Sequence, residues 1–428
     1  MTWKSAVNRF LFFTLLVAGL GAAGCDKKER DSHDHDHDEI VGALLVSDAE
    51  VGLINIVDLH DGDIVSSMDL EGPATIYPTA HTYYGVAIQT AEGLVNFIDT
   101  GIEIEEHGDH FHLHVGEPEL LGFELFGSTP VHFVSHDGWS AVHFDGSRED
   151  GIDAEVAAVL ESTLGDSEPE VLFFALDGPV HGAAVPARDN NFLITVPNPE
   201  YVSGVPDASS LPIGVNVYDE FGFVLQEFAD VENPDSSCVD LHGEAVTGNH
   251  YAFACGANFG VLVLTYNGGG GQFTSKNIPY PATDVRTGTL IAHESKSFFV
   301  GNFGSDALIK INPSSSETSV LDLPADQCGF VFENDGGNEV AVLTIDGFLQ
   351  VIDSNTWTIE ESIPVTSPFS CTGIRPGLAA GPGVAYVSIP EDGTVVEVGL
   401  HEPEIIREIE VGGTPGTMTA FAIKEIQH

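Results

Sequence analysis

Basic side chains are scarce in this 428-residue chain, which has 14 Lys and Arg against 66 Asp and Glu and a formal net charge of −52. Binding to a nucleic-acid backbone needs Lys and Arg to neutralise phosphates, and the same excess of carboxylates repels anionic lipid headgroups. The composition therefore excludes a nucleic-acid partner. It raises the local concentration of cations, which supports metal capture only weakly.

Short catalytic motifs are also missing: the chain has no nucleophile elbow, no HExxH motif and no phosphate-binding loop. Its one glycine-rich run, Gly268 to Gly271, is followed by Gln-Phe-Thr where a phosphate-binding loop has lysine. We therefore expect no enzyme activity. A metal-dependent hydrolase with residues scattered along the chain stays open as an alternative.

The five cysteines lack the paired CxxC spacings of a zinc–thiolate site. Cys25 stands apart near the N-terminus, and the other four are an even number, as in exported proteins with disulfides. We predict a bond between Cys238 and Cys255, which bracket one hairpin. A second bond is predicted between Cys328 and Cys371, which begin adjacent units of the repeat described below.

The first 25 residues are typical of an export signal, with Lys4 and Arg9 flanking the start, an apolar stretch from Leu11 to Leu20, and small residues before Cys25. A Cys at that point resembles a bacterial lipobox, which predicts lipidation of Cys25 and a periplasmic protein anchored to a membrane. The alternative is an ordinary signal peptide with an incidental Cys. Residues 26–40 then form a disordered His/Asp-rich tail, and residues 41–428 form a single domain.

From Ala43 to Ile423 the sequence repeats short strands separated by Asp-Gly, Asn-Gly or Gly-rich turns, which predicts an all-β fold. Helical periodicity is nearly absent, and Ile152 to Leu164 is the one short helix expected. The spacing of the units, roughly 40 to 60 residues, is typical of the four-stranded blades of a β-propeller. Comparable units begin near Ile76, Val131, Val180, Leu241, Arg286, Cys328 and Cys371.

The two ends of the repeat are incomplete and predict how the ring closes. Ala43 to Leu70 has only three strands, and Thr417 to Ile423 is a strand without a blade. Pairing them removes two free sheet edges and gives eight blades. Seven blades are the alternative, because insertions at 100–118 and 146–170 blur two boundaries, and a tandem of β-sandwiches fits the terminal half-blades less well.

Histidine is clustered in two places, and both clusters indicate a transition metal. Four imidazoles lie in the loop at 106–116, and three alternate with aspartates in the tail. Neutral imidazole is a donor suited to zinc, copper or nickel, and alternate residues of an extended run project to one side. The candidate ligands in these clusters are His107, Asp109, His110, His112 and His114 of the loop and His33, His35 and His37 of the tail.

Aligning the units places His132, His181 and His242 at equivalent positions, each at the start of a first strand. In a propeller those starts surround one mouth of the central channel, so three successive blades are expected to direct imidazoles at one point. His143 pairs across from His132 and is expected at the same rim. We expect the loop at 106–116 to be a lid over that mouth. The histidines near opposite turns or outside the pattern are interpreted as structural.

An acidic exported propeller with a His-rich N-terminus and the segment Glu106-His-Gly-Asp-His-Phe-His-Leu-His114 resembles the AztD family of periplasmic zinc metallochaperones. The resemblance covers most of the mature chain. It implies that the protein binds zinc and passes it to the solute-binding protein of an ABC zinc importer, without catalysis. The apparent lipid anchor at Cys25 departs from that pattern. The remaining alternative is an adhesion or assembly propeller with incidental histidines.

Overall fold

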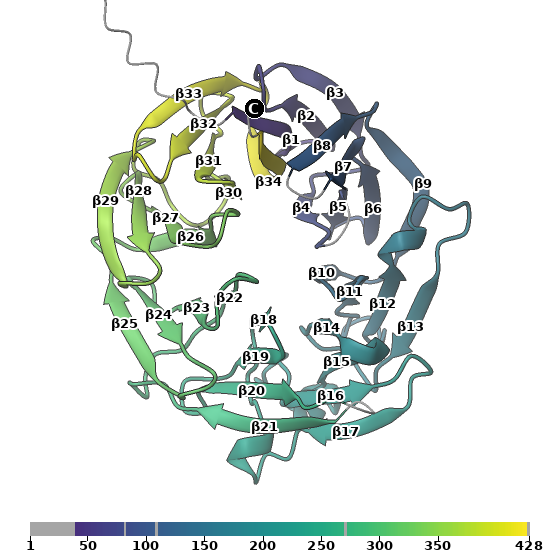
Figure 1. The fold of residues 1–428 in the computed structure, drawn as a ribbon. Helices are drawn as coiled ribbons and strands as arrows, with labels where there is room; N and C mark the ends of the chain where they lie inside the picture. The colour runs from purple at the N-terminus through teal and green to yellow at the C-terminus, as the bar shows by residue number, and fades with distance from the viewer. Residues whose placement is uncertain (1–38, 81–82, 108–109, 269–271, 426–428) are drawn as a thin grey trace, which may run out of the picture. The chain divides into compact units, whose positions relative to one another are not determined.

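The computed structural model describes residues 39–80, 83–107, 110–268 and 272–425. Eight four-stranded antiparallel sheets are arranged in a ring, which makes the domain an eight-bladed β-propeller (Figure 1). The predicted fold and blade number are thus confirmed. Cys25, His33, His35 and His37 lie outside the described residues.

The first four blades are described from the innermost strand outward. Blade 1 is formed from both ends of the described chain, and blade 2 carries an additional hairpin. Their strands are β34 (Pro415–Glu425), β1 (Glu39–Asp48), β2 (Leu53–Asp58) and β3 (Ile64–Asp69); β4 (Thr75–Pro78), β5 (Tyr84–Gln89), β6 (Leu94–Asp99) and β9 (Glu119–Phe126), with the hairpin β7 (Ile102–His107) and β8 (His110–Val115); β10 (Pro130–His136), β11 (Trp139–Phe144), β12 (Glu155–Leu160) and β13 (Val171–Ala175); β14 (Ala184–Ala187), β15 (Asn191–Val196), β16 (Gly214–Tyr218) and β17 (Val224–Phe228).

Blades 5 to 8 follow the same order from the centre outward, each with four consecutive strands. Their strands are β18 (Glu244–Thr247), β19 (His250–Ala254), β20 (Val261–Tyr266) and β21 (Phe273–Ile278); β22 (Leu290–Ile291), β23 (Phe299–Asn302), β24 (Ala307–Ile311) and β25 (Thr318–Asp322); β26 (Gln327–Phe332), β27 (Glu339–Thr344), β28 (Phe348–Asp353) and β29 (Thr358–Pro364); β30 (Leu378–Gly381), β31 (Val384–Ile389), β32 (Thr394–Gly399) and β33 (Ile405–Glu410).

A tight turn joins the two inner strands of blade 3. Between β10 and β11 the two turn residues are Asp137 and Gly138, with φ of 51° and 82°. Two successive positive φ values define the tight hairpin turn that matches strand twist, and Asp-Gly is a preferred sequence for it. Because strands alternate in direction, every innermost strand begins at the same face of the ring. We call this the start face and the other the opposite face.

The ring closes as the incomplete ends predict. β1 pairs antiparallel with β34 over a long register that runs from Glu39 with Glu425 to Asp48 with Pro415. Apolar residues of β1 and β34, among them Leu44 and Met418, pack against the inner strands of blade 8, including Tyr386. The pairing leaves the ring without an unpaired edge between its first and last strands.

One element differs from the sequence prediction. The predicted helix at 152–164 is wrong, because residues 155–160 form β12 and Glu161–Thr163 form the 3-10 helix η1. Val156 to Val159 are buried between the neighbouring blades on both faces of the sheet. A strand covered on both faces has a continuous apolar run, which periodicity does not distinguish from a buried helix.

Helical structure is minor elsewhere in the described residues. Beside η1, it consists of α1 (Pro199–Val202), η2 (Arg188–Asn190) and η3 (Pro234–Ser236). No helix in this part of the chain is long and apolar enough to cross a membrane.

Both predicted disulfides are present. Cys238 and Cys255, with Cα atoms 4.9 Å apart, are fully buried beside the inner hairpin of blade 5. Cys328 and Cys371, with Cα atoms 5.4 Å apart, join the start of β26 to the loop before β30. The second bond therefore ties blade 7 to blade 8 at the start face.

Candidate metal centre

Three histidines from successive blades meet at the start face. His132 is in β10, His181 precedes β14 and His242 precedes β18. Together they form a group in which one ring nitrogen of each residue lies within 4.8 Å of the other two. The structure thus brings together the three rim residues that the repeat selects. We call this group the histidine centre.

The spacing of the ring nitrogens fits zinc. The Nε2 atoms of His132 and His181 are 3.5 Å apart, and those of His181 and His242 are 3.3 Å apart. Two nitrogens bound to one tetrahedral zinc at its usual bond length lie about 3.3 Å from each other. The imidazoles therefore lie near the separation that a shared ion imposes.

The opposite ring nitrogens are held by the protein. His181 Nδ1 donates to Asp145 Oδ2 at 2.6 Å, and His242 Nδ1 donates to the carbonyl oxygen of Gly288 at 2.6 Å. His132 Nδ1 lies 3.6 Å from Glu244 Oε1. A carbonyl oxygen only accepts, so the proton of His242 is on Nδ1 and the lone pair is on Nε2. Metal-binding histidines are oriented by this kind of contact in many proteins.

The consequence is that unprotonated nitrogens face one another. Asp145 and Gly288 place protons on the outer nitrogens of His181 and His242, so the two Nε2 lone pairs are directed at each other across 3.3 Å. Two acceptors at this distance repel unless a proton or a cation lies between them. The network that orients the imidazoles therefore also favours a bound cation.

Two carboxylates behind the imidazoles supply negative charge. Burial alone would raise the pKa of Asp145, but hydrogen bonds from His143 and His181 outweigh it and hold that pKa below its usual value. Burial likewise opposes ionisation of Glu244, and the contact with His132 outweighs it and lowers the Glu244 pKa. Both groups are ionised at neutral pH. Their two charges match a divalent cation bound by three neutral imidazoles.

His143 supports the centre from behind. It is fully buried, and its Nδ1 lies 3.1 Å from Asp145 Oδ1, so Asp145 accepts from His143 with one oxygen and from His181 with the other. Burial lowers the pKa of His143, which keeps the ring neutral. His143 lies on β11 opposite His132, at the same rim, as expected. It is a partner of Asp145 and does not join the three-histidine group.

Glycines follow two of the three histidines, and both positions are crowded. A Cβ at Gly182 would lie 2.2 Å from Thr195 Oγ1 and 2.9 Å from His143 Nε2. A Cβ at Gly243, where φ is +94°, would lie 2.7 Å from the Gly288 carbonyl oxygen. Any larger residue would displace the groups that orient His181 and His242.

The centre is accessible to solvent on one side. The side chains of His132 and His181 are 18% and 29% exposed. A cation can therefore reach the Nε2 atoms without unfolding of the blades, and a fourth ligand from outside can approach it. Zinc sites with three protein ligands keep such an open position.

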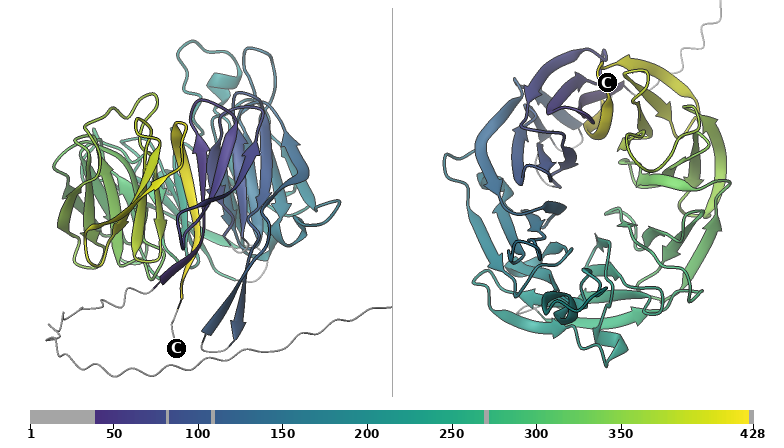
Figure 2. Two further views of the ribbon diagram at one scale, coloured as in Figure 1. Left: turned by 90° about the horizontal axis from the view of Figure 1, so that it is seen from above. Right: turned by 180° about the vertical axis from the view of Figure 1, so that it is seen from behind.

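The His-rich loop is not a lid over this centre. Its residues form the β7–β8 hairpin, in which Ile102 pairs with Val115 and Glu103 pairs with His114. β6, which precedes the hairpin, ends at the opposite face, and the hairpin extends from there (Figure 2). The prediction of a lid is wrong because the third strand of a blade runs in the same direction as the first and therefore ends at the opposite face.

Residues 108–109, which include Asp109, lie outside the described residues, and of the side chains of His107, His110 and His112 nothing is described. The register places residue 107 opposite 110 and residue 105 opposite 112. His114 is exposed.

The histidines interpreted as structural have protein partners where they are described. His136 contacts the Pro186 carbonyl at 3.0 Å, and His250 contacts Thr265 at 2.9 Å. His401 contacts Glu339 at 3.1 Å, and His293 contacts Ser295 at 2.8 Å.

Sequence reasoning missed the two carboxylates. Asp145 lies two residues after His143, and Glu244 lies two residues after His242. A carboxylate that close to a candidate ligand is a usable signal, because metal-bound histidines commonly donate to one.

Replacing Asp145 with Asn tests the orienting network. We expect Asp145→Asn to weaken zinc binding about 10- to 100-fold, because the partner of His181 loses its charge. Asp137→Asn, an equal charge change in the exposed turn of the same blade, is the control. Competition titration against a zinc chelator measures the zinc affinity of both variants. If Asp145→Asn binds zinc as tightly as Asp137→Asn, Asp145 does not orient a ligand.

Zinc affinity should also depend on pH in a defined direction. Burial opposes protonation of His132, but Glu244 and Asp145 outweigh it and raise the His132 pKa, whereas burial lowers the pKa of His242. As pH falls, His132 is therefore protonated before His242 and stops binding metal. Glu244→Gln should shift this loss of affinity to lower pH. Zinc affinity is measured for wild type and Glu244→Gln from about pH 5 to 8. If both proteins lose zinc at the same pH, Glu244 does not control protonation of His132.

Comparisons with known proteins find relatives over most of this chain. No protein-family model matches the chain. Zinc chaperone AztD of Citrobacter koseri is 31% identical over 392 residues, which cover 90% of this chain and 87% of the relative. Two solved structures of C. koseri AztD, one of them the apo protein, are 29% identical and superpose with TM-scores of 0.80 and 0.79. The apo structure covers 90% of this chain and 98% of its own chain, and the other structure covers 91% and 100%.

A more distant likeness concerns the fold alone. The dihydro-heme d1 dehydrogenase NirN is 12% identical over 88% of this chain and 75% of its own, with a TM-score of 0.55. The likeness to AztD, in contrast, extends through both sequence and structure over nearly the whole propeller. The chain therefore belongs to the AztD family of zinc chaperones.

Proposed function

We propose that this protein binds zinc at the histidine centre and passes it, without catalysing a reaction, to the solute-binding protein of an ABC zinc importer. The observation that carries the proposal is the convergence of three imidazoles. Asp145 and the Gly288 carbonyl hold the outer nitrogens of two of them, and Glu244 lies beside the outer nitrogen of the third. The family supports zinc as the cargo.

Zinc fits the donor set better than a hard cation. Three imidazole nitrogens suit zinc, copper or nickel, whereas magnesium and calcium take oxygen ligands. Zinc accepts a tetrahedral arrangement without an electronic preference, and the two separations of 3.3 and 3.5 Å are close to those that it imposes.

A hydrolase is the weaker alternative. A catalytic zinc needs an acid or base beside its open position. Asp145 and Glu244 both contact the Nδ1 side of the imidazoles, away from the Nε2 atoms that would hold the metal. These two carboxylates therefore orient ligands, which suits binding and release.

The tail and the hairpin form a second part of the proposal. β1 begins at Glu39 and pairs with Glu425 at the opposite face, from which the β7–β8 hairpin also extends. We place capture of zinc on His33, His35 and His37 of the tail and on His107, Asp109, His110, His112 and His114 of the hairpin. The affinity of these residues should be lower than that of the histidine centre, because ligands already oriented by a folded frame lose less conformational freedom on binding.

The proposed partner lies outside the cytoplasm, which requires export. We propose that residues 1–25 direct export to the periplasm and that Cys25 carries the lipid anchor, so that the protein acts at a membrane surface. Stable attachment needs more than one acyl chain. Wild type should be recovered with membranes after cell fractionation and Cys25→Ser in the soluble periplasmic fraction. Equal distribution of both proteins would exclude the anchor.

Double variants separate binding from transfer. His132→Ala with His181→Ala should remove most of the affinity for one equivalent of zinc, because one imidazole cannot close a site. His112→Ala with His114→Ala, and separately deletion of residues 32–38, should leave that equivalent bound and slow its loading or transfer. His293→Ala with His401→Ala is the matched control. Chelator competition measures binding, and mixing with the purified solute-binding protein measures transfer.

Retention of one tightly bound zinc by the His132 and His181 variant would place the site elsewhere. If wild type binds zinc tightly but does not transfer it to the solute-binding protein, the zinc site is supported and the proposed partner is excluded.

A further inference from the structure

A second feature of the start face has no role in the histidine centre. It is a cavity of about 700 Å³, within the size range of small-ligand sites. Its walls come from the beginnings of the innermost strands of blades 7, 8, 1 and 2, including Gly329 of β26, Leu378 of β30, Thr417 of β34 and Thr75 of β4. The histidine centre occupies the same ends of blades 3, 4 and 5.

The charge of the cavity differs from that of the rest of the molecule. The chain has 66 Asp and Glu, yet no carboxylate is among the described residues that line the cavity. Arg375 is the one charged side chain there, and the remaining walls are small or apolar residues such as Phe330 and Leu343. Among the described residues, no carboxylate lies within ion-pairing distance of Arg375. The lining of the cavity thus has no negative charge and one positive charge, that of Arg375.

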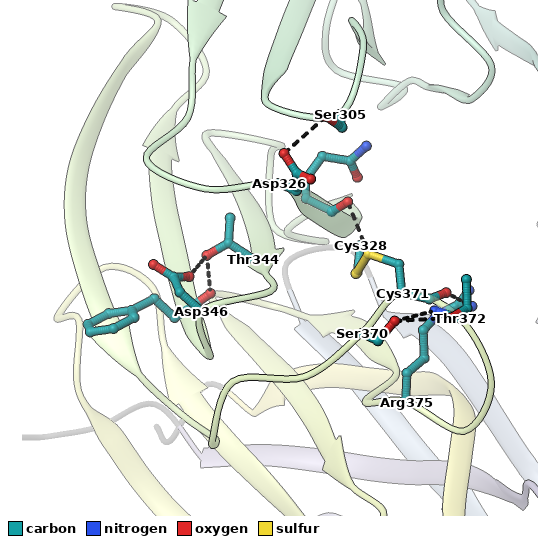
Figure 3. Close-up of a disulfide and its surroundings, with 11 residues drawn as sticks. Ser305, Asp326, Cys328, Thr344, Asp346, Ser370, Cys371, Thr372 and Arg375 are labelled. Atoms are coloured by element: carbon teal, nitrogen blue, oxygen red, sulfur yellow. Dashed lines mark hydrogen bonds between the residues drawn. A yellow bond between two sulfur atoms is a disulfide. The ribbon is translucent and has the colours of Figure 1, made fainter.

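Arg375 lies in the loop that the second disulfide ties to blade 7. Its loop is tied to β26 through Cys328 and Cys371, and Arg375 Nη1 donates to the Cys371 carbonyl at 2.7 Å (Figure 3). Ser370 and Thr372 contact each other through their hydroxyl groups at 3.0 Å in the same loop. One guanidinium nitrogen is therefore used to hold the side chain, and the other donors remain for a ligand.

The cavity adjoins the histidine centre. Thr90, which lines the cavity, donates its hydroxyl to the Pro130 carbonyl at 2.8 Å. Pro130 begins β10, two residues before His132. A ligand held in the cavity and a metal at the centre would therefore share one mouth of the propeller.

We propose that this cavity docks a carboxylate-bearing segment of the zinc acceptor, with the carboxylate on Arg375 and apolar neighbours against Phe330 and Leu343. The proposal rests on the proposed function and adds the place and chemistry of docking. Charge complementarity carries it, because a partner with acidic groups is repelled by most of this surface and accepted at Arg375.

Docking beside the centre would assist transfer by ligand exchange. The incoming ligand first forms one bond to zinc at its open position. Each Zn–Nε2 bond that then breaks is replaced by a bond to the acceptor, and the released Nε2 regains a lone pair. No oxidation or proton source is needed.

The first experiment tests the cavity without metal. Tricarballylate, a tricarboxylate, is titrated into the zinc-free full chain and followed by ligand NMR. Wild type and Arg148→Gln, which removes one positive charge outside the cavity, should bind it equally. Arg375→Gln should weaken binding at least about threefold, and Arg375→Lys should retain part of it. Equal binding by Arg375→Gln and Arg148→Gln would overturn the proposal, whether or not the centre binds zinc.

The second experiment tests the connection with the metal. Zinc is extracted from the loaded protein by nitrilotriacetate, which has three carboxylates, and by terpyridine, which is neutral. Arg375→Gln should slow extraction by nitrilotriacetate about threefold or more and leave both extraction by terpyridine and equilibrium zinc affinity unchanged. Equal slowing with both chelators, or no slowing with either, would exclude docking at Arg375. Failure of the wild-type protein to bind zinc tightly would instead contradict the proposed function.

Discussion

The centre depends on one constraint, namely that the outer nitrogen of each imidazole is engaged by the protein. Asp145 and the Gly288 carbonyl fix the tautomers of His181 and His242, and Glu244 lies against the outer nitrogen of His132. The inner lone pairs then face each other at separations that fit zinc. A divalent cation relieves their repulsion and balances the two buried carboxylates, so the same contacts determine orientation, charge and the direction of the pH response.

The propeller makes this constraint possible because successive blades present equivalent positions to one axis. Each histidine comes from a different blade, and each orienting group comes from another blade than its histidine. Asp145 of blade 3 holds His181 of blade 4, the loop before blade 6 holds His242, and Glu244 of blade 5 lies beside His132 of blade 3. That loop is itself fixed by Asn302, which accepts from the backbone amides of Gly288 and Thr289. Closure of the ring by β1 and β34 keeps these blades from separating. A rigid frame with one solvent-exposed side suits a metal that must be bound firmly and then released.

Much of this arrangement could be predicted from the sequence because it repeats. The spacing of the repeat units and their incomplete ends were sufficient to predict eight blades. Equivalent positions within aligned units were sufficient to select His132, His181 and His242. The helix expected at 152–164 failed because burial on both faces removes the alternation that identifies a strand. The lid expected at 106–116 failed because its position depends on the direction of β6, which strand counting would have supplied. The spacing of Asp145 and Glu244 from a histidine marks them as candidates, but the fold decides which imidazole each one meets: Asp145 contacts His181, and Glu244 lies beside His132.

The most direct test of the central claim is a crystal structure of the protein with one equivalent of zinc, located by anomalous scattering at the zinc edge. The account predicts one ion bonded to Nε2 of His132, His181 and His242 at about 2.0 to 2.1 Å, with Asp145 and the Gly288 carbonyl still bound to the opposite nitrogens. Zinc bonded through Nδ1, or found only on the β7–β8 hairpin while the three histidines keep their contacts, would contradict it.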